Sequence, residues 1–336
     1  MNRTILFLML ALILSPCLFS QPQNLVFEGS GIRGIAYSGA IRELEERNLL
    51  QGVQKLGGTS AGAITALLLS IGYTSQQITE IVNSTSFKKF NDGKYFFFGG
   101  INRFKKYYGW YRGQEFDKWL SELIKAKTNN ADISFSELHS KGYKDLYVTA
   151  TCLNKQSLVI FSHEAYPDMK VKDAVRISMS IPLYFEAVFT DASGHIAEHP
   201  KDKTGLDVMV DGGFIANFPI KLFDSTKYTD PSQPNRFVVN EHTLGFRIDR
   251  QQQIENDANN KGLAGMKISN LGEYVSAFYN IVIENLNRQS LSREDWERTV
   301  SISDGNIAPR IRKLSTEEVK ILTGNGEVAT RAFLGK

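Results

Sequence analysis

Short hydrophobic runs alternate with amphipathic segments near the start of the chain. Residues 24–28 (NLVFE) predict a short buried strand, and residues 34–47 predict a helix. Residues 53–56 predict a second strand, and residues 61–71 a second helix. This alternation is typical of an α/β fold with a mostly parallel central sheet. The first helix carries its apolar residues on one face, at i, i+3, i+4 and i+7: Tyr37, Ala40, Ile41 and Leu44.

Further elements follow in the middle of the chain. Residues 145–152 and 157–162 predict two more strands. A helix is expected over residues 169–178, with Asp168 as its cap. A short apolar strand over residues 208–210 ends at Asp211.

The last third of the chain is less regular. We expect a strand over residues 242–248 and a polar loop over residues 251–262. Ser315 and Glu318 form a capping-box pair that begins another helix. Residues 266–292 predict a long helix with these side chains inward: Ile268, Leu271, Val275, Phe278, Val282 and Leu286.

The first twenty residues have the pattern of an export signal. Arg3 gives a short positive segment, and residues 5–14 form an apolar core too short to span a bilayer as a helix. We expect a signal peptide over residues 1–20, with cleavage after Ser20, and therefore an exported protein: periplasmic, secreted or membrane-associated. An uncleaved anchor and a lipoprotein modified at Cys17 stay open as alternatives.

Composition narrows the possible functions. The chain has 336 residues, 42% hydrophobic composition and a net charge of +3, which is an ordinary globular balance and not that of a nucleic-acid binder. After removal of the signal, Cys152 is the remaining cysteine, so no intramolecular disulfide is expected. Its strand-like context favours a small buried side chain over a catalytic thiol.

The segment GGTSAGA presents a serine between two glycines. Gly58, Thr59, Ser60, Ala61 and Gly62 fit the GxSxG nucleophile elbow, a sharp strand-to-helix turn that exposes a serine hydroxyl. The flanking predicted strand and helix are those that the elbow requires. A glycine-rich helix start is the simpler alternative, because GxSxG is common by chance.

A second glycine loop, GSGIRG, lies between the first strand and the first helix. A dinucleotide fingerprint would need an acidic residue roughly 20 positions later, where this chain carries the Ser60 motif instead. We therefore favour an oxyanion hole, in which backbone N–H groups bind a negative oxygen. Its residues would be Gly29, Ser30, Gly31, Ile32, Arg33 and Gly34.

A third motif is the DGG sequence formed by Asp211, Gly212 and Gly213. An aspartate at the end of an apolar strand lies where α/β enzymes place active sites. Partial burial would raise its pKa and make it a better base. Without the other motifs, a turn aspartate that bonds its own backbone would be the preferred interpretation.

These three motifs occur in the order and approximate spacing of the patatin-like phospholipases, which the chain resembles. The strings AVRISMSIPLYFEAV and VDGGFIANFPI are also similar to the family's segments around its catalytic aspartate, and GNGEVATRAFL to its terminal helix. Ser30 stands where the family usually has glycine. The resemblance predicts a catalytic domain over residues 24–224, with residues 225–336 forming a C-terminal region packed on it through a late strand and helices.

The resemblance implies a three-layer α/β/α sandwich and a Ser–Asp dyad without histidine. Ser60 would attack the ester carbonyl of a lipid, and Asp211 would accept its proton. The implied activity is that of a lipid acyl hydrolase, or phospholipase A-type esterase, in lipid catabolism, with no cofactor. The partner would be membrane lipid or another acyl ester; the sequence does not determine the oligomeric state.

Two other function classes remain open. The order Ser60, Asp211, His242 would also fit the triad of an α/β-hydrolase. A non-catalytic lipid-binding protein could retain the same fold.

Residues 94–119 are rich in aromatic and basic side chains. They suit either a transient contact with a membrane surface or a cap over the active-site groove. His195 and His199 lie in a polar loop for which solvent exposure is favoured over metal binding, so no metal site and no nucleic acid are expected.

Overall fold

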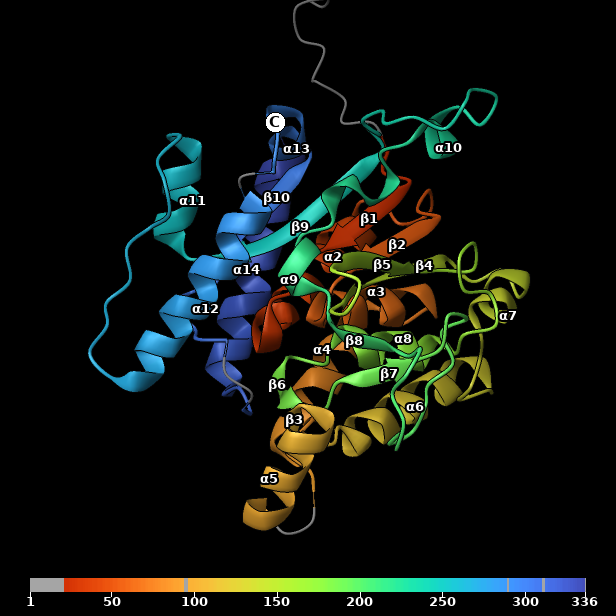
Figure 1. Cartoon of the computed structure of the whole chain (residues 1–336). Helices are drawn as coiled ribbons and strands as arrows, with labels where there is room; N and C mark the ends of the chain where they lie inside the picture. Colours follow the sequence, from red (N-terminus) through yellow and green to blue (C-terminus); the bar gives the residue numbers. More distant parts are fainter. Residues whose placement is uncertain (1–20, 94–95, 289, 310–311, 336) are drawn as a thin grey trace, which may run out of the picture.

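The computed structural model describes residues 21–93, 96–288, 290–309 and 312–335 (Figure 1). The expected signal peptide lies outside the described residues. A central sheet runs through the molecule with the strand order β10-β9-β1-β2-β4-β8-β7, and β5 also pairs with β4. The strands are β1 (Asn24–Phe27), β2 (Lys55–Gly58), β4 (Asp145–Cys152), β5 (Ser157–Phe161), β7 (Val188–Thr190), β8 (Asp207–Asp211), β9 (Thr243–Asp249) and β10 (Thr299–Ser303).

The neighbours from β10 to β4 are parallel, whereas β8 runs antiparallel to both β4 and β7. The mostly parallel sheet expected from the sequence is confirmed. Strands β9 and β10 follow residue 224 and extend the same sheet beside β1, and β10 is an element that the sequence pattern did not predict. A two-stranded sheet pairs β3 (Gly109–Tyr111) with β6 (Leu183–Phe185).

Helices cover both faces of the sheet. The α-helices are α2 (Ala36–Glu46), α3 (Ala61–Ser70), α4 (Ser75–Ser84), α5 (Phe96–Tyr107), α6 (Gln114–Thr128), α7 (Phe135–Ser140), α8 (Val171–Ser178), α9 (Gly213–Ala216), α10 (Thr226–Thr229), α11 (Gln251–Ala258), α12 (Leu271–Arg288), α13 (Arg293–Glu297) and α14 (Thr316–Leu334). Three 3-10 helices are η1 (Gly31–Ile35), η2 (Phe87–Phe90) and η3 (Ile220–Phe223).

Alternating side chains of the buried strands divide the core between the two faces. In β1, Leu25 and Phe27 join the large cluster with α2, α3 and α8, while Val26 contacts a small cluster around Phe223 of η3. A strand whose residues are buried on both faces is typical of parallel sheets between helical layers. The result is the predicted α/β/α sandwich.

Several details of the sequence prediction were wrong. Asp168 does not cap α8, whose N-cap is Lys170. The expected polar loop at residues 251–262 contains α11. The long helix is shorter than expected, and three of its supposedly inward side chains are exposed: Ile268, Leu271 and Phe278.

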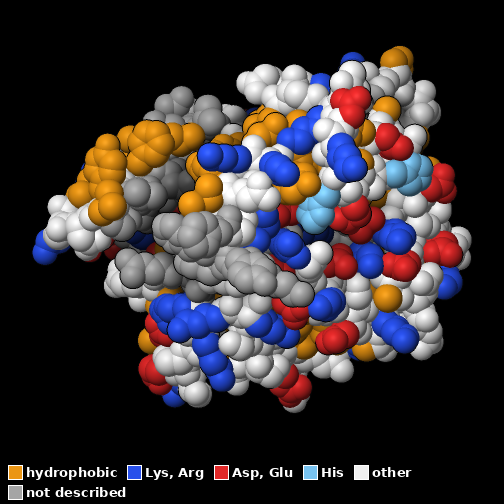
Figure 2. Space-filling model, turned by 60° about the horizontal axis from the view of Figure 1, so that its bottom comes forward, with side chains coloured by type: hydrophobic (Ala, Val, Ile, Leu, Met, Phe, Trp, Pro, Cys, Tyr) orange, Lys and Arg blue, Asp and Glu red, His pale blue; other side chains and the backbone are white. Residues whose placement is uncertain are grey.

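Figure 2 shows where the exposed side chains of α12 gather. Hydrophobic side chains cluster at the left margin of this face, where the first half of α12 lies. By contrast, the capping box of Ser315 and Glu318 begins α14 as predicted.

Candidate active site

Two loops meet at the carboxyl ends of adjacent parallel strands. Phe27, the last residue of β1, pairs with Gly58, the last residue of β2, so the glycine loop and the serine turn leave the sheet side by side. Asp211 arrives differently, because β8 is antiparallel to β4 and Asp211 pairs with Ala150. The sequence pattern favours a parallel strand here, whereas β8 runs in the opposite direction and ends at the same edge of the sheet.

Ser60 occupies a strained turn between β2 and α3. Its φ of 53° and ψ of −120° lie in a region that side chains other than glycine rarely adopt. The flanking glycines permit this turn: a Cβ on Gly58 would lie 2.4 Å from the Gly62 carbonyl carbon, and one on Gly62 would lie 2.2 Å from the Phe27 carbonyl oxygen. The GxSxG spacing therefore has a steric cause at both glycines.

The Ser60 side chain lies near the Asp211 carboxyl and lowers its pKa against the effect of burial. The Ser60 hydroxyl donates to the Met179 sulfur at 3.6 Å. The Ser60 backbone N–H donates to Ser178 Oγ at 2.8 Å, which fixes the turn against the end of α8. Ser178 and Met179 lie in the segment AVRISMSIPLYFEAV, where neither belongs to a catalytic motif of its own.

Asp211 is almost fully buried, with 3% of its surface exposed. Burial raises the pKa of its carboxyl from 3.8 to about 6, against the opposing hydrogen bonds from the Gly213 N–H and the Ser60 hydroxyl. The Gly213 N–H donates to Asp211 Oδ1 at 2.8 Å. A Cβ on Gly212 would lie 2.6 Å from the Thr149 carbonyl oxygen, so the DGG turn packs tightly on β4. The carboxylate is thus placed and tuned to take a proton near neutral pH.

The glycine loop presents backbone N–H groups beside Ser60. Gly31 adopts a φ of +58°, and residues Gly31–Ile35 form η1, whose first N–H groups have no partner within the helix. Gly29 differs from the prediction, because its N–H already donates to the Asn217 carbonyl at 3.0 Å. Among the described residues, the N–H groups of Ser30, Gly31 and Ile32 have no hydrogen-bond acceptor, and neither has that of Ala61 at the start of α3, so these groups are available to bind a negative oxygen.

The remaining loop residues hold the loop in place. Arg33 Nε donates to the Ser30 carbonyl at 3.2 Å, and its Nη1 reaches Asp304 at 3.2 Å. A Cβ on Gly34 would lie 3.1 Å from the Ala61 Cβ, so η1 packs directly on the start of α3. Arg33 and Gly34 are therefore suited to shaping the loop.

Besides the Gly29 N–H bond, two further hydrogen bonds tie the elbow and the loop to the segment after Asp211. Thr59 Oγ1 donates to the Ala216 carbonyl at 2.7 Å. The Asn217 side-chain amide donates to the Gly29 carbonyl at 3.0 Å. Sequence reasoning missed Asn217, because an asparagine six residues after the aspartate carries no recognisable motif alone.

The alternative triad is wrong for this structure. His242 directly precedes β9, and its carbonyl accepts from the N–H of Asn24 at the start of β1. Ser60 lies beyond the other end of the sheet, and the four residues of β1 alone span about 10 Å at roughly 3.3 Å each. The imidazole of His242 cannot reach the Ser60 hydroxyl from there.

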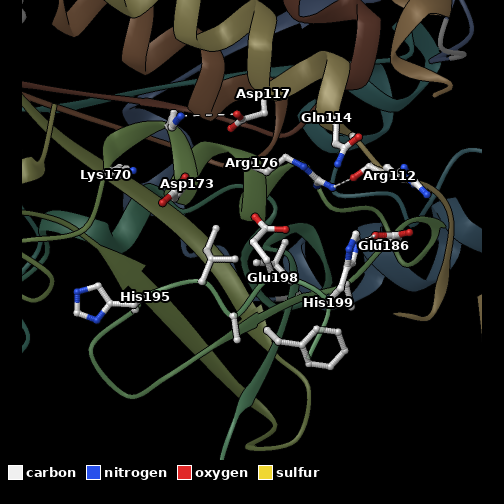
Figure 3. A pocket seen from close by; sticks show the side chains of 18 of the residues that line it. Arg112, Gln114, Asp117, Lys170, Asp173, Arg176, Glu186, His195, Glu198 and His199 are labelled. Atoms are coloured by element: carbon white, nitrogen blue, oxygen red, sulfur yellow. Dashed lines mark hydrogen bonds and ion pairs between the residues drawn. The ribbon is translucent and has the colours of Figure 1, made fainter. Parts of the chain in front are cut away.

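A cavity of about 710 Å³ lies next to this site without containing Ser60 or Asp211 (Figure 3). Arg176 lines it and donates to Ser180 Oγ at 2.6 Å, while the Ser180 carbonyl accepts from the Asp211 N–H at 2.9 Å. His199, whose side chain is 40% exposed as expected for a solvated loop, also bonds the buried Glu186 at 2.9 Å in the cavity wall. The cavity wall supports the backbone of the aspartate.

One cluster of metal-ligating side chains occurs in the described part of the chain: His139, Asp145 and His163. The two imidazoles stack 4.1 Å apart with an angle of 7° between their planes, and both face the same carboxylate. An ion bound to a ring nitrogen lies near the plane of that ring, so one ion cannot bind two parallel stacked rings. His139 hydrogen-bonds Asp145 at 2.7 Å at the start of β4, whereas His163 Nδ1 lies 3.6 Å from the same oxygen.

The aromatic stretch over residues 94–119 divides between core and surface. Phe116 and Trp119 are buried in the large cluster, whereas Phe104 and Tyr108 are exposed. The expectation of one interfacial or capping surface therefore applies only to part of the stretch. Cys152 is buried in β4, as predicted.

Comparison with known proteins agrees with this geometry. The family model described as patatin-like phospholipase matches residues 25–224. The uncharacterized protein YqhO of Bacillus subtilis (strain 168) is 34% identical over 212 residues, which cover 60% of this chain and 67% of that protein. A probable lipid hydrolase of Invertebrate iridescent virus 6 is 27% identical over 201 residues, which cover 60% of this chain and 62% of that protein.

Among solved structures, VipD from Legionella pneumophila has a similar fold. The TM-score is 0.56 at 15% identity, over 94% of this chain and 67% of that chain. The chain thus spans about two thirds of the length of each of these proteins.

Proposed function

Because this chain belongs to the patatin-like phospholipase family, we propose that it is a lipid acyl hydrolase in which Ser60 and Asp211 form the catalytic dyad. The observation that carries the proposal is the pairing of a serine on a left-handed turn with a buried aspartate whose pKa is raised to about 6. The substrate class would be phospholipid or another acyl ester, cleaved in the manner of a phospholipase A.

In the first half-reaction Ser60 Oγ forms a bond to the ester carbonyl carbon while its proton passes to Asp211. The carbonyl oxygen gains the electron pair, and the N–H groups of Gly31, Ile32 and Ala61 are suited to bind it. When the intermediate collapses, the bond to the leaving alcohol breaks and Asp211 returns the proton to that oxygen. An acyl ester on Ser60 remains.

The second half-reaction uses the same groups with water. Asp211 takes a proton from a water molecule, whose oxygen bonds to the acyl carbon. Collapse breaks the bond to Ser60 Oγ, the proton returns from Asp211 to that oxygen, and the fatty acid leaves. A single carboxylate thus serves as base and acid in each half-reaction, provided its pKa lies near the working pH.

The test compares the purified chain with its Ser60→Ala variant on p-nitrophenyl butyrate and on a mixed phospholipid extract. We expect ester turnover and release of fatty acid and lysolipid, identified by mass spectrometry, from the unaltered protein only. Equal turnover by both proteins would rule out Ser60 as the nucleophile. A chain that releases no product and is not labelled by a fluorophosphonate would instead be the non-catalytic lipid-binding protein.

We also propose that the protein is exported through residues 1–20. The support is the charge and hydrophobicity of that segment. N-terminal sequencing of extracytoplasmic protein should give a start near Gln21, and a cytoplasmic chain that begins at Met1 would contradict export.

A further inference from the structure

Helix α12 exposes a stripe of large apolar side chains. Leu271, Tyr274, Phe278 and Ile281 are 77%, 58%, 64% and 50% exposed. Their spacing of three, four and three residues places them on one side of a helix with 3.6 residues per turn. We call these four residues the α12 stripe.

The stripe faces away from the protein core. Ile283 is buried and lies nearly opposite the stripe on the helix, so α12 is attached through its other face. Just before the helix, Met266 and Ile268 are also exposed. Six large hydrophobic side chains within sixteen residues are thus open to solvent, which marks a binding surface and not the scattered exposure of ordinary surfaces.

The helix that carries the stripe contacts the segment that follows Asp211. Helix α12 packs against α9, which begins two residues after Asp211. Ile215 on α9 is itself 40% exposed. Figure 2 shows hydrophobic side chains at the left margin of the molecule, where the first half of α12 lies in Figure 1.

We propose that the α12 stripe inserts into the surface of a lipid bilayer and thereby brings the active site to its substrate. The proposal rests on the lipid hydrolase function proposed above. A helix with one apolar side lies in the plane of the interface, with its apolar face buried about 5–10 Å deep. No helix in the described residues is long and apolar enough to cross a membrane.

Charge favours an anionic bilayer. Lys261 and Lys267 are exposed in the segment that leads into α12. In the first turn of α12 the carboxylate of Glu273 accepts from the Ser269 N–H at 2.7 Å, which holds this carboxylate against the backbone. Lysines beside an apolar helix face add electrostatic attraction to anionic headgroups.

The stripe is a narrow row of side chains. A specific protein–protein contact uses about 20–30 residues on each side, whereas the described exposed large apolar side chains on and just before α12 number six. A bilayer accommodates a narrow row of side chains, because lipid tails adapt to their shape. We therefore assign lipid, and not a second copy of the chain, as its occupant.

The experiment uses a Leu271→Ser/Phe278→Ser double variant and a matched Phe237→Ser control. Phe237 is 64% exposed, the same as Phe278, but lies in the segment before β9. Sedimentation with phosphatidylcholine vesicles containing 30% phosphatidylglycerol should show at least a tenfold weaker binding for the double variant and no change for the control. Turnover of soluble p-nitrophenyl butyrate should be equal in all three proteins.

A second readout reports insertion directly. Tryptophan placed by Phe278→Trp should be quenched by brominated lipid tails, and tryptophan placed by Phe237→Trp should not. Unchanged vesicle binding by the double variant, or equal quenching at both positions, overturns the proposal. If light scattering shows a dimer that the double variant no longer forms, while vesicle binding stays intact, the stripe binds a second copy of the chain and the proposal is overturned.

A failure of the proposed hydrolase function can be distinguished from a failure of the membrane-binding inference. Vesicle binding by the Ser60→Ala variant measures docking without catalysis. Retained binding without soluble-ester turnover by the unaltered protein would reject the hydrolase function and leave the stripe as a lipid-binding surface.

Discussion

Asn217 and Gly29 hold each other through two reciprocal hydrogen bonds. The Asn217 side-chain amide donates to the Gly29 carbonyl at 3.0 Å, and the Gly29 N–H donates to the Asn217 carbonyl at 3.0 Å. A Cβ on Gly29 would lie 2.4 Å from Asn217 Oδ1, so only glycine fits this contact. The pair fixes the start of the glycine loop to the segment that follows Asp211.

Asn217→Ala should lower kcat by about 100-fold with KM nearly unchanged, because the loop donors would no longer be held at the oxyanion. Asn217→Asp should be similarly poor, since a carboxylate cannot donate to the Gly29 carbonyl. Steady-state kinetics on p-nitrophenyl butyrate provide the measurement. The control is Asn154→Ala, which removes a similar bond to the Leu206 carbonyl on the surface; equal losses in both variants would contradict a positioning role.

Ser60→Ala should remove ester hydrolysis by several orders of magnitude while the protein stays folded. Ser60→Gly should be equally inactive but more stable than Ser60→Ala by about 1–3 kcal/mol, because glycine adopts a φ of 53° without strain. Thermal denaturation and circular dichroism compare the two variants. A glycine variant that is less stable than the alanine variant would show that the turn is not strained.

Asp211→Asn should be nearly as inactive as Ser60→Ala, because the amide keeps the shape but cannot accept the serine proton. His242→Ala should keep most of the activity, since His242 lies at the opposite end of the sheet. The three variants are compared on one short-chain ester. A folded His242→Ala protein as inactive as Ser60→Ala would restore the triad.

Activity should fall as the pH drops through about 6, the raised pKa of Asp211, because the protonated carboxyl cannot act as a base. At pH 5 only about a tenth of the carboxylate would be available. The pH profile of kcat/KM provides the measurement. A profile that stays level down to pH 4.5 would contradict Asp211 as the base.

The raised pKa of Asp211 affects the stability of the fold in the opposite direction to activity, because stability falls as the pH rises. The folded protein binds the Asp211 proton more tightly than the unfolded chain, so this contribution is complete below pH 3.8 and is lost as the pH rises toward 6. The loss amounts to about 3 kcal/mol at 1.36 kcal/mol per pKa unit. Asp211→Asn, which carries no charge, should therefore gain stability relative to the unaltered protein between pH 4 and pH 8 in urea denaturation.

Gly39→Ala should destabilise the fold by about 3 kcal/mol, because a Cβ there would lie 1.8 Å from the Thr323 carbonyl oxygen where α2 crosses α14. Gly324→Ala in α14 is the matched control. Its Cβ would meet nothing within 4 Å, so the substitution should stabilise the helix by about 1 kcal/mol. Denaturation midpoints distinguish them, and a tolerated Gly39→Ala would mean that the helices separate easily.

The sequence by itself determined the local elements and the chemistry they carry. The apolar spacing at Tyr37 and Leu44 predicts α2, and the glycines around Ser60 predict the turn, because each depends on neighbours a few residues apart. Periodicity failed for α12, where the apolar pattern of Leu271 and Phe278 was assigned to the core. The spacing of apolar residues shows that a helix has an apolar face, but it does not show whether that face packs against the protein core or is exposed.

Only the tertiary structure decided how the site is assembled. The antiparallel entry of β8, which brings Asp211 to Ser60, follows from strand pairing and has no signature within the strand itself. Gly29 and Asn217 lie 188 residues apart, and their contact exists only after both flanking strands join the same sheet. The distance of His242 from Ser60 has the same origin. The sequence pattern places His242 at the start of a strand, but only the direction of that strand within the sheet decides at which end of the sheet His242 lies.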